Sequence, residues 1–169
     1  MKSFFVPLFA ILCIAHPVLA DPDFVITERY FDLVEKIIIE ANRTKCFFSL
    51  ERLLKSLSKK TIRETLAYLS WKAESIQKDA RECLKVPCHD IPEEAVIALE
   101  EELKIARPLI IAMNQPNFLS CLKKINIDNS WRESTPDFDM EISYEESIKI
   151  GEAFGLSEEL KPFERFGPY

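Results

Sequence analysis

The chain has 169 residues, of which 47% are hydrophobic and 30% charged, and its formal net charge is −6 at pH 7. This length suits one domain that can bury a core without a metal, and the acidic balance argues against nucleic acid or anionic lipid as a partner. With only three glycines and many Leu, Ile, Glu and Lys residues, the composition favours helices.

The first twenty residues have the parts of a secretory signal. Lys2 provides a positive start, residues 4–19 are almost wholly apolar, and Val18-Leu19-Ala20 is a cleavage site of the small-residue type. The apolar run is shorter than the roughly 20 residues that a bilayer core requires. We therefore expect a cleaved signal over 1–20, a single extracellular domain over 21–169, and no membrane span.

Apolar residues recur at the 3.6-residue helical period along most of the remaining chain, and two segments, Thr61–Glu64 and Ser143–Glu146, match the helix-starting capping box. The pattern predicts an all-α, mostly up-and-down bundle of about five to six helices. The predicted helices run from Pro22 to Asn42, through Leu50 and Leu57, from Thr61 to Cys83, from Asp90 to Met113, from Asn114 to Ile125 and from Ser143 to Gly155.

A long polar loop is expected over residues 126–142. Asp, Asn, Ser, Thr and Pro dominate it, and we predict that Trp131, Phe138 and Ile142 tuck their side chains onto the bundle. At the other end of the last helix, residues 162–169 are rich in aromatic residues and proline. This tail is expected either to fray or to dock back onto the bundle.

Four cysteines remain after removal of the signal: Cys46, Cys83, Cys88 and Cys121. An even number in an exported chain indicates two disulfides. At ~1.5 Å per helical residue, antiparallel neighbouring helices place Cys46 and Cys121 at comparable heights, whereas Cys83 lies far along its helix. We therefore predict that the pairs Cys46–Cys121 and Cys83–Cys88 staple the bundle.

Catalytic and metal sites are not expected. His89 is the only histidine beyond the signal, and none of the three glycines begins a phosphate-binding loop. Cys83, Cys88 and His89 are close in sequence, but a structural zinc site usually has a ligand pair on each side, and a second pair is missing. The sequence predicts a protein that is not an enzyme and that holds no cofactor and no metal.

One modification signal is specific. Asn42-Arg43-Thr44 is an N-glycosylation sequon at the end of the first predicted helix. In a eukaryotic source we expect Asn42 to bear a glycan.

The remaining functions are binding functions. The first is a protein-interaction or effector and signalling role, exerted through an exposed helix face. The alternative is an extracellular carrier of a small hydrophobic ligand or lipid in an interhelical cavity, because Phe47, Phe48 and Trp71 lie off the main apolar stripes. An enclosed cavity lined by these three residues and by the helix that contains Pro108 would favour the carrier, and a solid core with an exposed apolar patch would favour the interaction protein.

Overall fold

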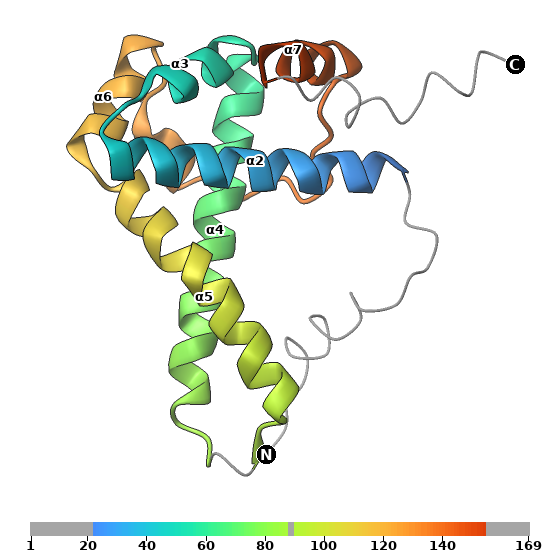
Figure 1. The fold of residues 1–169 in the computed structure, drawn as a ribbon, viewed down its shortest axis with the longest axis vertical. Helices are drawn as coiled ribbons and strands as arrows, with labels where there is room; N and C mark the ends of the chain where they lie inside the picture. The colour runs from blue at the N-terminus through green and yellow to red at the C-terminus, as the bar shows by residue number, and fades with distance from the viewer. Residues whose placement is uncertain (1–21, 88–89, 155–169) are drawn as a thin grey trace, which may run out of the picture.

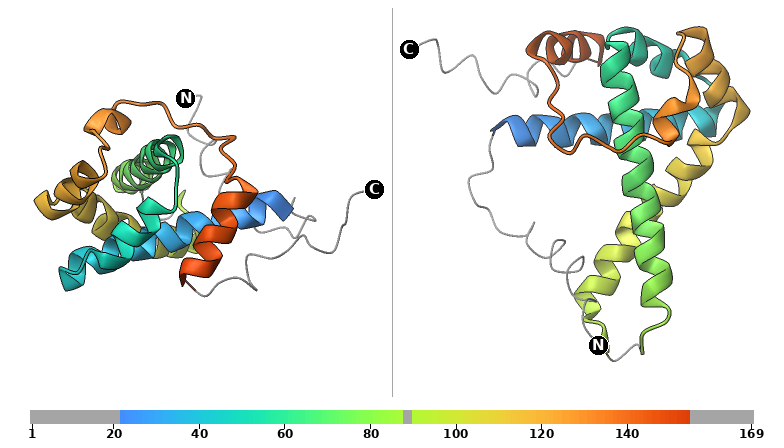
Figure 2. Two further views of the ribbon diagram at one scale, coloured as in Figure 1. Left: turned by 90° about the horizontal axis from the view of Figure 1, so that it is seen from above. Right: turned by 180° about the vertical axis from the view of Figure 1, so that it is seen from behind.

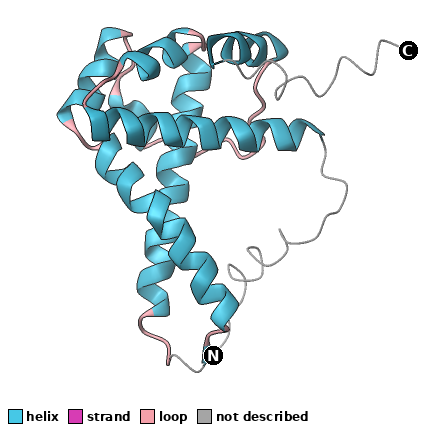
Figure 3. Cartoon of the chain, viewed as in Figure 1, coloured by secondary structure: helices cyan, strands magenta, loops and turns pink. Residues whose placement is uncertain are grey.

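The computed structural model describes residues 22–87 and 90–154, with side chains from residue 29 onwards. Its helices, in chain order, are α2 (Pro22–Thr44), α3 (Phe48–Lys55), α4 (Lys59–Cys83), α5 (Glu93–Met113), α6 (Pro116–Lys124), the short 3-10 helix η3 (Asn129–Arg132) and α7 (Tyr144–Phe154) (Figure 1). The described residues contain no strand, so the predicted all-α class is confirmed (Figure 3). The predicted signal, Cys88, His89, Gly155 and the 162–169 tail lie outside the described residues.

The helices are not all parallel or antiparallel to one another. α4 and α5 run side by side in opposite directions, as an up-and-down pair should, and they form the most extensive helix contact of the molecule. α2 crosses this pair steeply in both side views (Figures 1 and 2). The expectation of a mostly up-and-down bundle therefore holds for α4 and α5 but not for α2.

The core is confined to one end of the α4–α5 pair. The buried residues of α4 fall between Thr61 and Ala73, and those of α5 fall between Ala106 and Met113. Around this end, which we call the head, lie α2, α3, α6, η3 and α7 (Figure 2). The rest of the pair, residues 74–87 and 90–105, projects from the head, and we call it the arm; it contains no buried residue.

The head core is built from large side chains of several helices. Tyr30 of α2, Phe118 of α6 and Trp131 of η3 are among its largest fully buried side chains. Trp131 is 1% exposed, so the prediction that it tucks into the bundle is confirmed. Phe138 remains 59% exposed and packs edge-on against Trp71 of α4, with 4.8 Å between the ring centroids. Its predicted burial is wrong, because the loop meets α4 on an outer face.

The start of α4 differs from the prediction. Ser58 is the N-cap, and its hydroxyl oxygen accepts a hydrogen bond of 3.1 Å from the Thr61 backbone N–H. The predicted capping box at Thr61–Glu64 is therefore wrong, since Ser58 takes the capping role three residues earlier. Thr61 instead donates its hydroxyl hydrogen to Glu146.

Of the predicted starts of α5 and α7, the first is wrong and the second is confirmed. α5 begins at Glu93, with Pro92 as its N-cap, and not at Asp90 as predicted. At α7, the Glu146 backbone N–H donates to the Ser143 hydroxyl oxygen at 3.2 Å, so the predicted cap at Ser143 is confirmed.

One ion pair inside the head joins α2 to α4. Lys72 Nζ donates to Glu35 Oε1 at 3.0 Å, and the Glu35 side chain is 4% exposed. Burial disfavours the charged form of Lys72, but the Glu35 carboxylate outweighs it and raises the pKa of Lys72. A buried carboxylate is costly without such a partner, so this pair fixes how the two helices meet.

Candidate functional site

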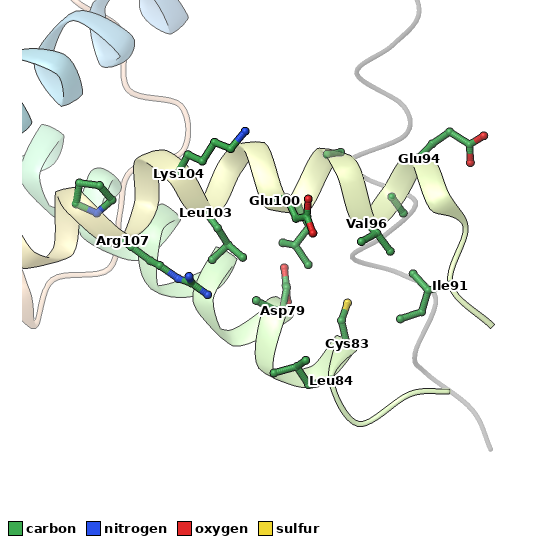
Figure 4. A pocket seen from close by; sticks show the side chains of 15 residues that line it. Asp79, Cys83, Leu84, Ile91, Glu94, Val96, Glu100, Leu103, Lys104 and Arg107 are labelled. Carbon is green, nitrogen blue, oxygen red and sulfur yellow. The ribbon is translucent and has the colours of Figure 1, made fainter. Parts of the chain in front are cut away.

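An open groove runs along the arm between α4 and α5, and its volume is about 820 Å³. From α4 it is lined by residues that include Asp79 and Cys83, and from α5 by Val96 and Leu103 (Figure 4). Leu84, in the turn beyond α4, borders its outer end and is 86% exposed.

The groove exists because the apolar stripes of both helices are longer than the head. On α4 the stripe continues past Ala73 through Ala80 and Cys83, and on α5 it includes Leu99 and Leu103. In the head, other helices cover such positions, and α2 still lies near Ile76 and Ile105 at the inner end of the arm, but farther out α4 and α5 meet only each other. Two helices cannot enclose a core, so these side chains stay at least partly exposed.

The charge of the groove changes along its length. Asp79 of α4 and Glu100 of α5 lie near its middle and point toward one another (Figure 4). Arg107 lies nearer the head, beside Lys104, which pairs with Glu101 on its own helix. Among the described residues, neither Glu100 nor Arg107 has an ion-pair partner. The groove is therefore acidic in its middle and basic toward the head.

α5 is also apolar outside the groove. Ile97 is 53% exposed, Ile111 is 56% exposed, and Ile105 is exposed on the side toward α2. A helix with apolar residues on every side is usually buried. Single exposed apolar residues are common on protein surfaces, but contiguous ones mark contact surfaces. α5 thus exposes more apolar surface than a solvated helix requires.

The three residues predicted to line a ligand pocket lie apart. Phe47 packs against the head core, whereas Phe48 is almost fully exposed. Trp71 borders a shallow hollow on the outer face of α4, together with Lys78 and Lys85. None of the three lines the arm groove. The apolar residues of the groove lie on the main stripes, where the sequence pattern predicts core. The sequence did contain one indication of the groove, because the stripes of α4 and α5 are longer than the other helices can cover.

A smaller hollow of about 100 Å³ lies where α2, α4 and α5 meet. Its charged lining includes Glu35, Lys72 and Glu102, and burial raises the pKa of the Glu102 carboxyl. Asp32 also lines the hollow, so three carboxyl groups surround the one ammonium group, that of Lys72. Among the described residues, no group of three His, Cys, Asp or Glu side chains could hold a metal ion.

Cys46, Cys83 and Cys121 are free thiols in the structure, so the predicted Cys46–Cys121 disulfide is not formed there. Cys121 is buried in the head, and burial raises the pKa of its thiol to about 11. Cys46 is exposed just before α3, and Cys83 lines the arm groove. The stapling therefore stays a prediction, and Cys88 lies outside the described residues.

The glycosylation sequon lies in the last turn of α2. Asn42 is half-buried there, and its side-chain oxygen accepts a hydrogen bond of 3.1 Å from Lys45 Nζ. The Thr44 hydroxyl donates to the backbone carbonyl of Glu40 at 2.8 Å. The sequon is thus folded into a helix end in the head, far from the outer end of the arm.

In the described part of the chain, no helix combines the length and the apolar character that crossing a bilayer requires. No protein-family model matches the sequence, and neither a curated protein nor a solved structure matches it. The groove is therefore interpreted from its own chemistry.

Proposed function

We propose that this is a secreted protein that acts by binding another protein, and that the arm groove is its binding surface. One observation carries the proposal: the arm contains no buried residue, although both of its helices bear apolar stripes there. Apolar surface in contact with water is unfavourable, and covering it on binding provides a driving force of roughly 25 cal/mol per Å².

The shape of the groove favours a helix as the bound segment. Two antiparallel helices leave a furrow into which the side-chain ridges of a third helix can pack. The stretch of α5 that lines it, from Glu94 to Pro108, is about 21 Å long at ~1.5 Å per residue, which matches nearly four helical turns. A fitting helix would place apolar anchors over Val96 and Leu103, a cation near Glu100 and an anion near Arg107.

The proposal includes the export signal, the two disulfides and a glycan on Asn42. Lys124 Nζ of α6 donates to Glu51 of α3 at 3.0 Å, so the helix that follows Cys46 lies beside the helix that contains Cys121. This neighbourhood supports the Cys46–Cys121 pair. A glycan on Asn42 would extend from the head and leave the arm groove open.

A hydrophobic-ligand carrier is the second candidate, and the size of the groove is what favours it. A volume of about 820 Å³ falls within the range of roughly 300–1,000 Å³ that is typical of small-molecule sites. Such sites bury most of their ligand, however, and this groove is only partly enclosed. A helix covers an open furrow better than a small molecule does.

Selection from a displayed library of helical peptides would test the proposal. We expect the selected peptides to share apolar residues at helical spacing and to lose at least about tenfold in affinity for the variants Leu84→Asp and Val96→Asp. Both side chains are exposed, so these variants should fold. The matched control is Ile148→Asp on α7, where an exposed apolar residue lies outside the groove.

Two results would count against the proposal. Peptides that bind Val96→Asp as well as wild type would place binding outside the groove. Saturable binding of a fluorescent fatty acid, lost in Val96→Asp, with no groove-dependent peptide recovered, would favour the carrier.

A further inference from the structure

We propose that the helix which fits the arm groove is α5 of a second copy of this chain, so that two copies pair antiparallel about Leu103. This inference rests on the proposed function, because it names the partner of the same surface. It follows from the order of apolar and charged residues along one face of α5.

Five residues of α5 form this face: Val96, Glu100, Leu103, Arg107 and Ile111. They follow one another at steps of four, three, four and four residues, which keeps them on one side of a helix. Four of them line the groove or its rim, and Ile111 extends the row toward the head while remaining 56% exposed. The face is therefore uncovered even beside the head.

The charges on this face complement themselves when it meets its own copy in the opposite direction. If Leu103 lies next to the two-fold axis, Glu100 of one copy stands level with Arg107 of the other, and the same contact forms twice. Neither side chain has an ion-pair partner among the described residues of its own chain. The same register brings Val96 of each copy to Ile111 of the other.

A parallel pairing of the two α5 helices is disfavoured by the same charges. It would place Glu100 beside Glu100 and Arg107 beside Arg107, and like charges brought together across an interface are unfavourable. Asp79 of α4 adds to the acidic middle of the groove, so it also favours the approach of Arg107 from the second copy.

The size of the face predicts a weak dimer. From Val96 to Ile111 it is about 22 Å long and, with the edge of α4, about 20 Å wide. The area of the face is therefore less than the ~800 Å² per partner that is usual for stable interfaces. We therefore expect an equilibrium between monomer and dimer that depends on protein concentration in the micromolar range.

Sedimentation equilibrium on the mature chain tests the inference with two charge reversals, Glu100→Arg and Arg107→Glu. Each variant alone would place two pairs of like charges in the interface, and we expect its dissociation constant to rise about tenfold. An equimolar mixture should regain dimers, because the two reversals are complementary in the mixed pair. The matched controls are Lys149→Glu and Glu152→Lys on α7, which should leave the wild-type equilibrium unchanged.

Three outcomes would separate this inference from the proposed function. A wild-type chain that stays monomeric up to about 500 µM while groove-dependent peptides bind it overturns the dimer and leaves the proposed function intact. A wild-type dimer whose two variants do not recover on mixing overturns the antiparallel α5 register. If neither dimers nor groove-dependent peptides are found, both proposals fail.

Discussion

The carboxylate of Glu146 in α7 accepts a hydrogen bond of 2.8 Å from the backbone N–H of Ser58, although 88 residues separate them. The Thr61 hydroxyl donates to the same carboxylate at 2.9 Å. The N-terminus of a helix has unpaired N–H groups and a partial positive charge, which a carboxylate satisfies. The last described helix is thus attached to the start of α4 by a polar contact.

The stability of the protein should fall on acidification partly because of this contact. Burial alone would raise the pKa of Glu146, but its hydrogen bonds with Ser58, Thr61 and Ser143 outweigh burial and lower the pKa below its ordinary 4.5. The stabilisation is therefore complete above about pH 4.5 and is lost as the pH falls through the lowered pKa.

We expect Glu146→Gln to reduce the loss of stability between about pH 5 and pH 3, and Glu146→Ala to cost about 2 kcal/mol at pH 7. Urea unfolding followed by circular dichroism measures both effects. Glu145→Gln, at the exposed neighbouring position, is the control. An unchanged pH dependence in Glu146→Gln would contradict the assignment.

Lys72→Met should destabilise the head, because it leaves the buried carboxylate of Glu35 without its cation. Removing one partner of a buried pair costs about 3–5 kcal/mol, and the partial exposure of Lys72 lowers our expectation to about 2–3 kcal/mol. Unfolding midpoints in urea provide the measurement.

The control for this prediction is Lys85→Met, which breaks an exposed pair with Glu82 and should leave the free energy of unfolding almost unchanged. The double variant Lys72→Met, Glu35→Leu should recover most of the lost stability. Equal costs for Lys72→Met and Lys85→Met would mean that Glu35 does not depend on its partner.

Tyr30→Phe isolates one buried hydrogen bond. The Tyr30 hydroxyl lies 2.8 Å from the Thr65 hydroxyl inside the head. Deleting it should cost about 1 kcal/mol in thermal or urea unfolding. Tyr144→Phe, whose ring is 64% exposed, should change stability by no more than about 0.3 kcal/mol. If the two variants behave alike, the hydroxyl pair contributes nothing measurable.

The predicted disulfides can be tested by mass mapping of unreduced tryptic peptides. We expect one peptide pair that joins Cys46 to Cys121 and one link between Cys83 and Cys88. A peptide joining Cys46 to Cys83 would contradict the pairing, because Cys83 ends α4 in the arm while Cys46 lies in the head. Alkylation of all four thiols without prior reduction would contradict the stapling itself.

The periodic pattern of the sequence was sufficient to predict the α-helices but not the short 3-10 helix η3, which lies in the predicted loop. α2 starts at Pro22, and α7 is capped by Ser143, as expected from local rules that depend on neighbouring residues alone. The start of α4 was misplaced because Ser58 and Thr61 are both good caps. Glu146, which is distant in sequence, accepts the Thr61 hydroxyl hydrogen in the folded chain.

The candidate site could not be predicted in the same way. A stripe such as Val96, Leu99 and Leu103 has the same spacing whether another helix covers it or not. Whether it becomes core depends on where α2 crosses the α4–α5 pair, and that crossing depends on contacts between distant residues, such as Glu35 with Lys72. The groove is therefore a property of the tertiary arrangement.

The confinement of all buried residues to the head has a consequence for the motions of the molecule. Because no residue of the arm is buried, the arm can open and reclose while the head stays folded. Its amide hydrogens should exchange with deuterium earlier than those of α2. A bound partner would slow that exchange, so the exchange rate of the arm amides would show whether the groove is occupied.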